Sequence, residues 1–104
     1  MDALKQDLSQ LYDEIWDNIK YNALGLLSKL NSDKSGQTIA KELILSAPGG
    51  GFQAICDLNR PDLTVEARVV ENPEWRRLLG REVVEVANWK LEQVGYTVKT
   101  PKTI

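Results

Sequence analysis

The residue types that the chain lacks limit the chemistry that it could perform. It contains no histidine and one cysteine, Cys56, in 104 residues. Without histidine, Ser-His-Asp and Cys-His catalysis are excluded, and one cysteine cannot complete a usual four-ligand zinc site. Any catalysis would therefore depend on carboxylates, lysine or arginine, with a metal ion such as magnesium held by oxygen ligands. We expect Cys56 to behave as a small buried hydrophobe.

Pro48 to Gly51 form a glycine-rich stretch that could hold a phosphate group. A Walker loop requires a lysine and a hydroxyl residue after its last glycine, whereas Phe52 and Gln53 follow Gly51 here. A dinucleotide-binding loop lies between a strand and a helix, and we expect a strand after Gly51. We therefore interpret Pro48 to Gly51 as a tight turn in which glycine supplies positive φ.

The first element that must position any site is a long amphipathic helix over residues 2–31. Its apolar side chains recur at spacings of three and four, as on one face of an α-helix. Such a helix would be about 45 Å long, in a domain whose radius of gyration is about 13 Å. We therefore expect it to overhang the core, to bend near Gly25 or to pack against another chain. The apolar face consists of Leu4, Leu8, Leu11, Ile15 and Ile19.

The centre of the chain predicts a small antiparallel β-meander. Residues 37–47 fit either a helical face or a buried strand, and we favour a strand because a segment of strand character follows them. Residues 52–58 read as that strand, and residues 63–70 alternate apolar and polar side chains. Since Pro61 and Asp62 between them have turn chemistry, the two segments predict a hairpin.

A second helix is expected after this meander. Asn72 would cap it and Pro73 would occupy its first position. Gly80 would weaken it by about 1 kcal/mol relative to alanine, and Gly95 would end it before a short strand over residues 96–100. The tail after that strand is expected to be frayed. Two aromatic residues on this helix are expected to pack in the core rather than stack on bases: Trp75 and Trp89.

The resulting order of elements, α-β-β-β-α-β, resembles the core of the PD-(D/E)xK nuclease-like proteins. In that family an acid on the second core strand and an acid-x-lysine motif on the third hold a metal ion. The resemblance implies that Asp57, Glu66 and Glu14 would hold magnesium, with Arg68 where the family has lysine. Because arginine does not give up its proton, an inactive relative of that fold is favoured over an active nuclease.

All five arginines lie in the second part of the chain, where they could contact phosphate or an acidic partner. Acidic residues are interspersed with three of them, which favours local pairing over a basic patch. The arginines are Arg60, Arg68, Arg76, Arg77 and Arg81.

The length of the chain predicts one domain over residues 1–104, and the expected helices and strands give it an α+β fold. Hydrophobic residues make up 42%, charged residues 27%, and the net charge is −2, as in soluble globular proteins. No apolar run is long enough to span a membrane, and the start does not have the pattern of a signal peptide. A single cysteine is typical of the cytoplasm.

Three functions follow from these features. We expect foremost a non-enzymatic interaction or regulatory module, without a cofactor, that associates with itself or with another protein through residues 2–30. The first alternative is a nuclease-like domain, active or degenerate, around Asp57, Glu66 and Arg68. The second is a nucleic-acid-binding regulator that uses the arginines.

Overall fold

A computed structural model describes residues 3–45 and 50–96 of the chain, and every element in these residues is helical. The expected α+β fold is therefore wrong for this part of the chain, where no strand occurs. The elements, in order, are α1 (Ala3–Ile19), α2 (Leu24–Leu30), α3 (Gly36–Leu45), α4 (Gly50–Asp57), the 3-10 helix η1 (Pro61–Leu63), α5 (Val65–Val70), α6 (Pro73–Leu79) and α7 (Arg81–Gln93).

The expected helix over residues 2–31 is two helices that fold back on each other. Lys20 adopts φ 54°, in the left-handed region, and ends α1. The Tyr12 hydroxyl then donates a 2.7 Å hydrogen bond to Asn22 Oδ1, which holds the connection against α1. The break therefore lies before α2 rather than near Gly25, which is inside it. Because the helix is divided, it fits within a molecule that is 35 Å in its longest dimension.

Helices α3 and α4 take the place of the strands expected over residues 37–47 and 52–58, as far as these residues are described. The Ser35 hydroxyl accepts a 3.2 Å hydrogen bond from the Thr38 N–H and so caps the start of α3. Ile39, Ala40 and Ile44 are buried at helical spacing. Gly50 and Gly51 belong to α4, so the expected tight turn is wrong for these two glycines. Pro48 and Gly49 lie outside the described residues.

The expected hairpin over residues 52–70 is also absent, since η1 and α5 occupy its second half. Thr64 starts α5, because its hydroxyl oxygen accepts a 3.1 Å hydrogen bond from the Ala67 N–H. The other residues of α5, apart from Arg68, are buried. Because α5 is short and buried on most sides, it lacks the polar face that identifies a surface helix. The alternation of apolar and polar residues along it therefore resembles the pattern of a strand.

The helix start at Asn72 is confirmed. Asn72 Oδ1 accepts hydrogen bonds from the N–H groups of Glu74 and Trp75 at 2.9 and 3.4 Å, and Pro73 takes the first helical position. Gly80, with φ 88°, ends α6 and separates it from α7, rather than only weakening one helix. The strand expected over residues 96–100 falls outside the described residues except for Tyr96.

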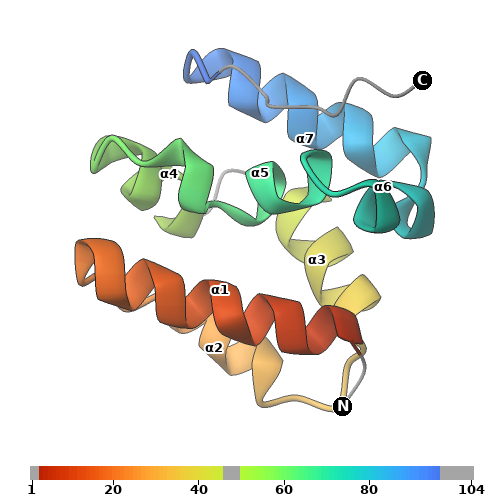
Figure 1. Ribbon diagram of the computed structural model, residues 1–104, viewed down its shortest axis with the longest axis horizontal. Coiled ribbons are helices and arrows are strands. Elements are labelled where there is room, and N and C mark those ends of the chain that lie inside the picture. The colour runs from red at the N-terminus through yellow and green to blue at the C-terminus, as the bar shows by residue number, and fades with distance from the viewer. Residues whose placement is uncertain (1–2, 46–49, 97–104) are drawn as a thin grey trace.

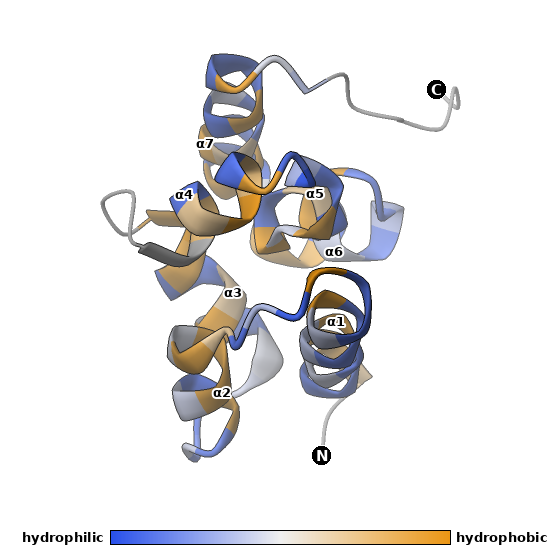
Figure 2. Ribbon diagram, turned by 90° about the vertical axis from the view of Figure 1, so that its left-hand side faces the viewer, coloured by the Kyte–Doolittle hydropathy of each residue, from blue (hydrophilic) through white to orange (hydrophobic). Residues whose placement is uncertain are grey.

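The helices surround one hydrophobic core. Both views place α1 and α2 at one end of the molecule and α7 at the other, with α3 between them (Figures 1 and 2). The short helix α5 lies inside this arrangement and packs against α3, α6, α7 and η1. The most completely buried large side chains include Trp75, Leu8, Leu11, Ile15, Ile39, Ile44 and Leu91.

Within residues 3–45 and 50–96, no helix combines the length and the apolar character needed to cross a bilayer.

Replacement by alanine should have opposite effects on stability at two glycines that lie in helices. A Cβ on Gly36 would lie 2.6 Å from the Leu4 carbonyl carbon, whereas a Cβ on Gly25 would meet nothing within 4 Å. Gly36→Ala should therefore lower the free energy of unfolding by about 1–3 kcal/mol through overpacking. Gly25→Ala should raise it by about 0.5–1 kcal/mol. Urea unfolding of both variants would measure this, and a neutral Gly36→Ala would contradict the close approach of α3 to α1.

Candidate functional site

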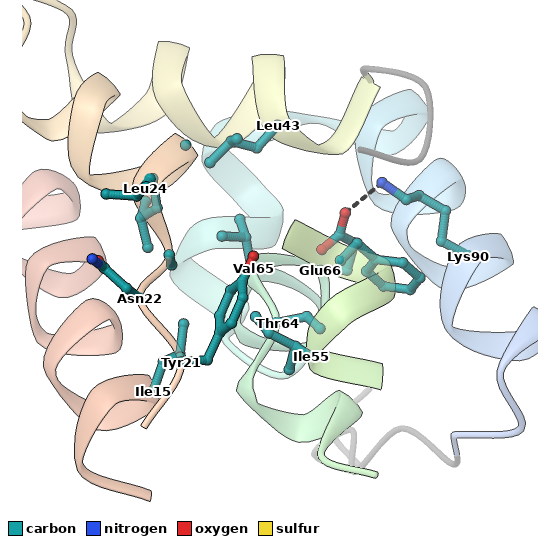
Figure 3. Close-up of a pocket in the computed structure, with 14 residues that line it drawn as sticks. Ile15, Tyr21, Asn22, Leu24, Leu43, Ile55, Thr64, Val65, Glu66 and Lys90 are labelled. Atoms are coloured by element: carbon teal, nitrogen blue, oxygen red, sulfur yellow. Dashed lines mark hydrogen bonds and ion pairs between the residues drawn. The ribbon is translucent and has the colours of Figure 1, made fainter. Parts of the chain in front are cut away.

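A pocket of about 410 Å³ opens between α2, α4 and α5 (Figure 3). Its volume lies in the range of about 300–1,000 Å³ that is typical of small-molecule sites. Most of its wall is apolar, and α1 and α3 each add a side chain to the walls made by α2, α4 and α5. The apolar wall includes Ile15, Leu24, Leu26, Leu43, Ile55 and Val65.

The break after α1 creates one wall of this pocket. Because Lys20 turns the chain, residues 21–26 double back and face α4 and α5 across the opening. Tyr21 extends from this wall, and Figure 3 shows its hydroxyl oxygen directed into the pocket. A continuous helix over residues 2–31 would have carried these residues away from α4.

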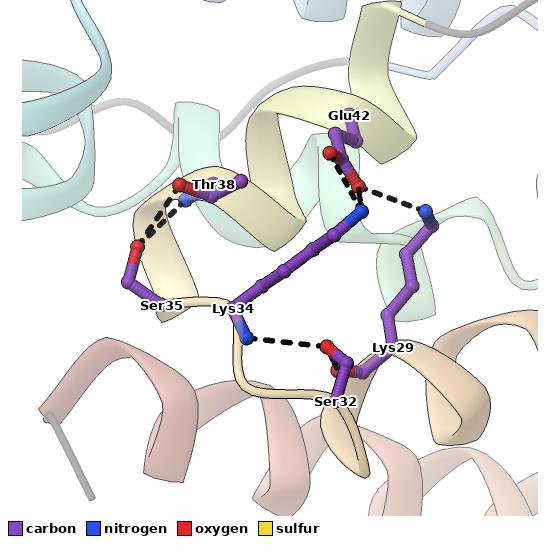
Figure 4. A network of polar contacts seen from close by, with 6 residues as sticks. All are labelled: Lys29, Ser32, Lys34, Ser35, Thr38 and Glu42. Carbon is purple, nitrogen blue, oxygen red and sulfur yellow. Dashed lines mark hydrogen bonds and ion pairs between the residues drawn. The ribbon is translucent and has the colours of Figure 1, made fainter.

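A second set of contacts fixes α2 against α3. Lys29 and Lys34 both donate 2.9 Å hydrogen bonds to the Glu42 carboxylate (Figure 4). The hydrogen bonds from Lys34 and then from Lys29 lower the pKa of Glu42. These groups are partly exposed, so their effect on stability is small.

A buried ion pair forms the polar part of the pocket wall. Lys90 Nζ lies 2.5 Å from Glu66 Oε2, and the two side chains are only 8% and 4% exposed. Lys90 Nζ also donates to the Ile44 carbonyl oxygen at 3.2 Å and lies 4.8 Å from the centroid of the Phe52 ring. The ammonium group is thus held by three partners from α3, α4 and α5.

This ion pair is costly to bury beside an apolar cavity. Desolvation of two charges offsets much of their mutual attraction, so apolar side chains of similar volume would stabilise such a site equally well. Charged groups in a concave apolar site are therefore candidates for a function. With its ammonium and carboxylate joined, the pair offers hydrogen bonding and no net charge.

A separate polar cluster joins α1 to α5 and α6. Arg68 donates to Asp7 Oδ1 at 2.7 and 3.1 Å and to Glu14 Oε1 at 2.9 Å. The Trp75 indole N–H donates to Asp7 Oδ2 at 2.5 Å. Burial would raise the pKa of Asp7, but the hydrogen bonds from Arg68 and Trp75 and the charge of Arg68 outweigh it, so the pKa is lowered.

The structure does not bring together the metal ligands implied by the nuclease resemblance. Glu66 pairs with Lys90, Glu14 pairs with Arg68, and Asp57 accepts a 2.9 Å hydrogen bond from Gln53. Glu66 and Arg68 would share one face of a strand, but in a helix residues two apart point about 200° from each other. Among the described residues, no group of three or more acids or cysteines is placed to hold a metal ion.

The residues that were expected to mediate association pack in or against the hydrophobic core of the protein itself. Leu8 and Leu11 are 0% exposed and Ile15 is 1% exposed, while Leu4 and Ile19 are half-buried and pack against the same core. This face of α1 contacts the protein's own helices. On the outer face, Trp16 is 46% exposed.

Most arginines are paired with a nearby acid. Arg60 binds Asp62, Arg77 binds Glu74 and Arg81 binds Glu85. The local pairing expected for Arg76, Arg77 and Arg81 is therefore confirmed for the last two, whereas Arg76 forms no ion pair with a described residue. Together with Arg68, four of the five arginines are paired with acids.

The expectations for the aromatic residues and the cysteine are met in part. Trp75 is 1% exposed and belongs to the core, whereas Trp89 is 60% exposed and lies on a different helix. Cys56 is half-buried. Burial, with the charges of Glu66 and Asp57, raises the pKa of its thiol to about 11. The thiol is therefore protonated and unreactive at neutral pH.

Lys90 and Asp7 were not predicted as residues of these sites, although the sequence pattern indicates both. Lys90 follows Val83 and Ala87 at spacings of seven and three, which places it on the buried face of its helix. Asp7 and Glu14 are seven residues apart and so share one side of α1, where a single cation can serve both. No such signal marked Tyr21, whose place depends on the break at Lys20.

The Asp7 cluster predicts a dependence of stability on pH. Because the pKa of Asp7 is lowered in the folded state, its contribution is present above the unfolded pKa of about 3.9 and is lost as pH falls through the folded pKa. Asp7→Asn should lower the free energy of unfolding by roughly 1.5–3 kcal/mol at pH 7, and the difference from the parent should shrink below pH 4. Urea unfolding across this range measures both. Asp13→Asn, on an exposed part of α1, is the control, and an equal loss at every pH would contradict the assignment.

The ion pair predicts that replacing Lys90 alone lowers the free energy of unfolding more than replacing both Lys90 and Glu66. Lys90→Met leaves a buried carboxylate without its partner and should lower the free energy of unfolding by about 3–5 kcal/mol. Combining it with Glu66→Leu should restore much of that loss, since no unpaired charge remains. Denaturant unfolding of both proteins is the measurement. A double variant no more stable than the single one would mean that packing, and not charge, determines the effect.

Comparison with known proteins adds no relative to this geometry. No family model, no curated protein and no solved structure gives a significant match to the chain. The function is therefore inferred from the pocket and its ion pair.

Proposed function

We propose that the protein is a non-enzymatic binding module whose pocket between α2, α4 and α5 holds a small, mainly apolar molecule. The observation that supports this most is the combination of a cavity of about 410 Å³ with a buried ion pair in its wall. Ligand sites have this composition, with a mainly apolar lining and a few fixed polar groups that orient the bound molecule.

The arrangement of the polar groups supports binding rather than catalysis. A lysine acts as a nucleophile only when its amine is deprotonated, and the Lys90 ammonium is held by Glu66, the Ile44 carbonyl and the Phe52 ring. Glu66 Oε2 accepts a hydrogen bond from the same ammonium. The pair is therefore suited to positioning a ligand.

Association through residues 2–30 stays a prediction, as does a cytoplasmic setting. The apolar face that suggested association is used within the chain, so a second copy or a partner would have to contact the outer face around Trp16. Sedimentation at micromolar concentration would test this separately from ligand binding.

The pocket predicts saturable binding of a neutral apolar dye. 1,6-Diphenyl-1,3,5-hexatriene, a hydrocarbon without a hydrogen-bond donor that fluoresces strongly in apolar surroundings, should bind at one site per chain. Gly25→Phe adds a ring at the pocket wall where a Cβ meets nothing within 4 Å, and Leu43→Trp enlarges a side chain on the α3 side. Both should weaken dye binding at least about tenfold, because the added rings occupy the cavity. Fluorescence titration gives the affinities.

The control is Gln10→Phe, which adds the same ring to an exposed position of α1. It should bind the dye as the parent does. Thermal unfolding of each variant would show that the fold is intact. Absence of saturable dye binding by the parent protein, or unchanged binding by both pocket variants, would refute the proposed function.

A further inference from the structure

We infer that the pocket selects neutral molecules that carry one hydroxyl or N–H donor on an apolar body, and that Glu66 accepts the hydrogen bond from this donor. The inference rests on the proposed function and adds the chemical class of the ligand. It is based on a difference between Glu66 and Lys90, which form a buried ion pair and both line the pocket. Lys90 is held by three partners within the chain, whereas one carboxylate oxygen of Glu66 has none among the described residues.

Lys90 has most of its polar contacts within the chain. An ammonium group has three N–H donors. One is directed to Glu66 Oε2 at 2.5 Å, one to the Ile44 carbonyl oxygen at 3.2 Å, and the Phe52 ring lies 4.8 Å from the same nitrogen. A ligand carboxylate would therefore have to compete with these partners for the ammonium.

Glu66 retains an open acceptor. A carboxylate has two oxygens that can accept about four hydrogen bonds in total, and Lys90 binds Oε2. Among the described residues, no donor lies within hydrogen-bond distance of Oε1. A fully buried Oε1 would then be a buried side-chain oxygen without a partner, and this part of the chain contains none. Oε1 is thus accessible from the pocket that Glu66 lines, and Figure 3 shows the carboxylate at its wall.

The net charge of the wall favours a neutral ligand. Glu66 and Lys90 cancel each other, so a neutral molecule leaves the buried region neutral. A ligand ammonium would approach the Lys90 charge, and a ligand carboxylate would approach that of Glu66. Either ion would also lose its hydration in a mainly apolar cavity, which is unfavourable without a full counter-charge.

The Tyr21 hydroxyl is the competing candidate for contact with the ligand head group. It projects into the pocket from the opposite wall (Figure 3), and a phenol can both donate and accept. Its contribution can be removed by Tyr21→Phe without changing the ion pair. A preference for donors that depends on Glu66 should survive this substitution.

The experiment displaces 1,6-diphenyl-1,3,5-hexatriene, which has no hydrogen-bond donor, from the parent protein at pH 7 with four naphthalenes that differ in one group. These are 2-naphthalenemethanol, its methyl ether, 2-naphthoate and 2-naphthylmethylammonium. A hydrogen bond to a charged acceptor corresponds to about a tenfold gain or more in affinity. The alcohol should therefore bind at least about tenfold more tightly than the ether and than either ion.

Two variants assign this preference to Glu66. Tyr21→Phe should keep it. The double variant Glu66→Leu with Lys90→Met should lose it while still binding the dye, because the apolar cavity persists without the ion pair.

The outcomes separate this inference from the proposed function. Equal affinity for the alcohol and the ether, with dye binding intact, overturns the role of Glu66 and leaves the pocket. Tightest binding of either ion overturns the neutral class, and loss of the preference in Tyr21→Phe assigns the contact to Tyr21 instead. If the dye does not bind at all, both proposals fail.

Discussion

The helix α5 connects the two ends of the molecule through two charged side chains that point in nearly opposite directions. Glu66 and Arg68 are two residues apart, so a helix directs them to nearly opposite sides. Glu66 binds Lys90 of α7, while Arg68 binds Asp7 and Glu14 of α1. A helix of six residues is too short to be stable by itself, and these ion pairs together with its buried apolar side chains hold it in place.

The pocket exists because the helices around α5 do not close completely. Lys20 divides the N-terminal helix, α2 returns along α1, and Glu42 of α3 binds Lys29 of α2 and Lys34 of the connection between them. The space that remains between α2 and α4 is lined by apolar groups and by the Glu66–Lys90 pair. A chain selected for stability alone would gain by filling such a space with larger side chains. Its retention beside a costly ion pair is the physical argument for a ligand.

The two ion-pair sites differ in purpose although both involve α5. The Arg68 cluster joins Asp7, Glu14 and, through Asp7, the Trp75 indole. None of these residues lines the pocket, and the cluster docks α1 on α5 and α6. The Glu66–Lys90 pair is satisfied on its cationic side and open on its anionic side, toward the cavity. This asymmetry distinguishes a candidate binding site from a structural contact.

The sequence by itself determined features that depend on neighbouring residues. The cap at Asn72 with Pro73, the apolar face of α1, the pairing of Arg77 with Glu74 and of Arg81 with Glu85, and the exclusion of histidine chemistry are all local. Only the tertiary structure decided that residues 65–70 are helical. A short helix buried on most sides lacks the amphipathic period that identifies a helix, and packing outweighs the strand preference of its valines. The turn at Lys20, and with it the pocket, was decided in the same way, because a lysine adopts positive φ only where surrounding contacts compensate the strain.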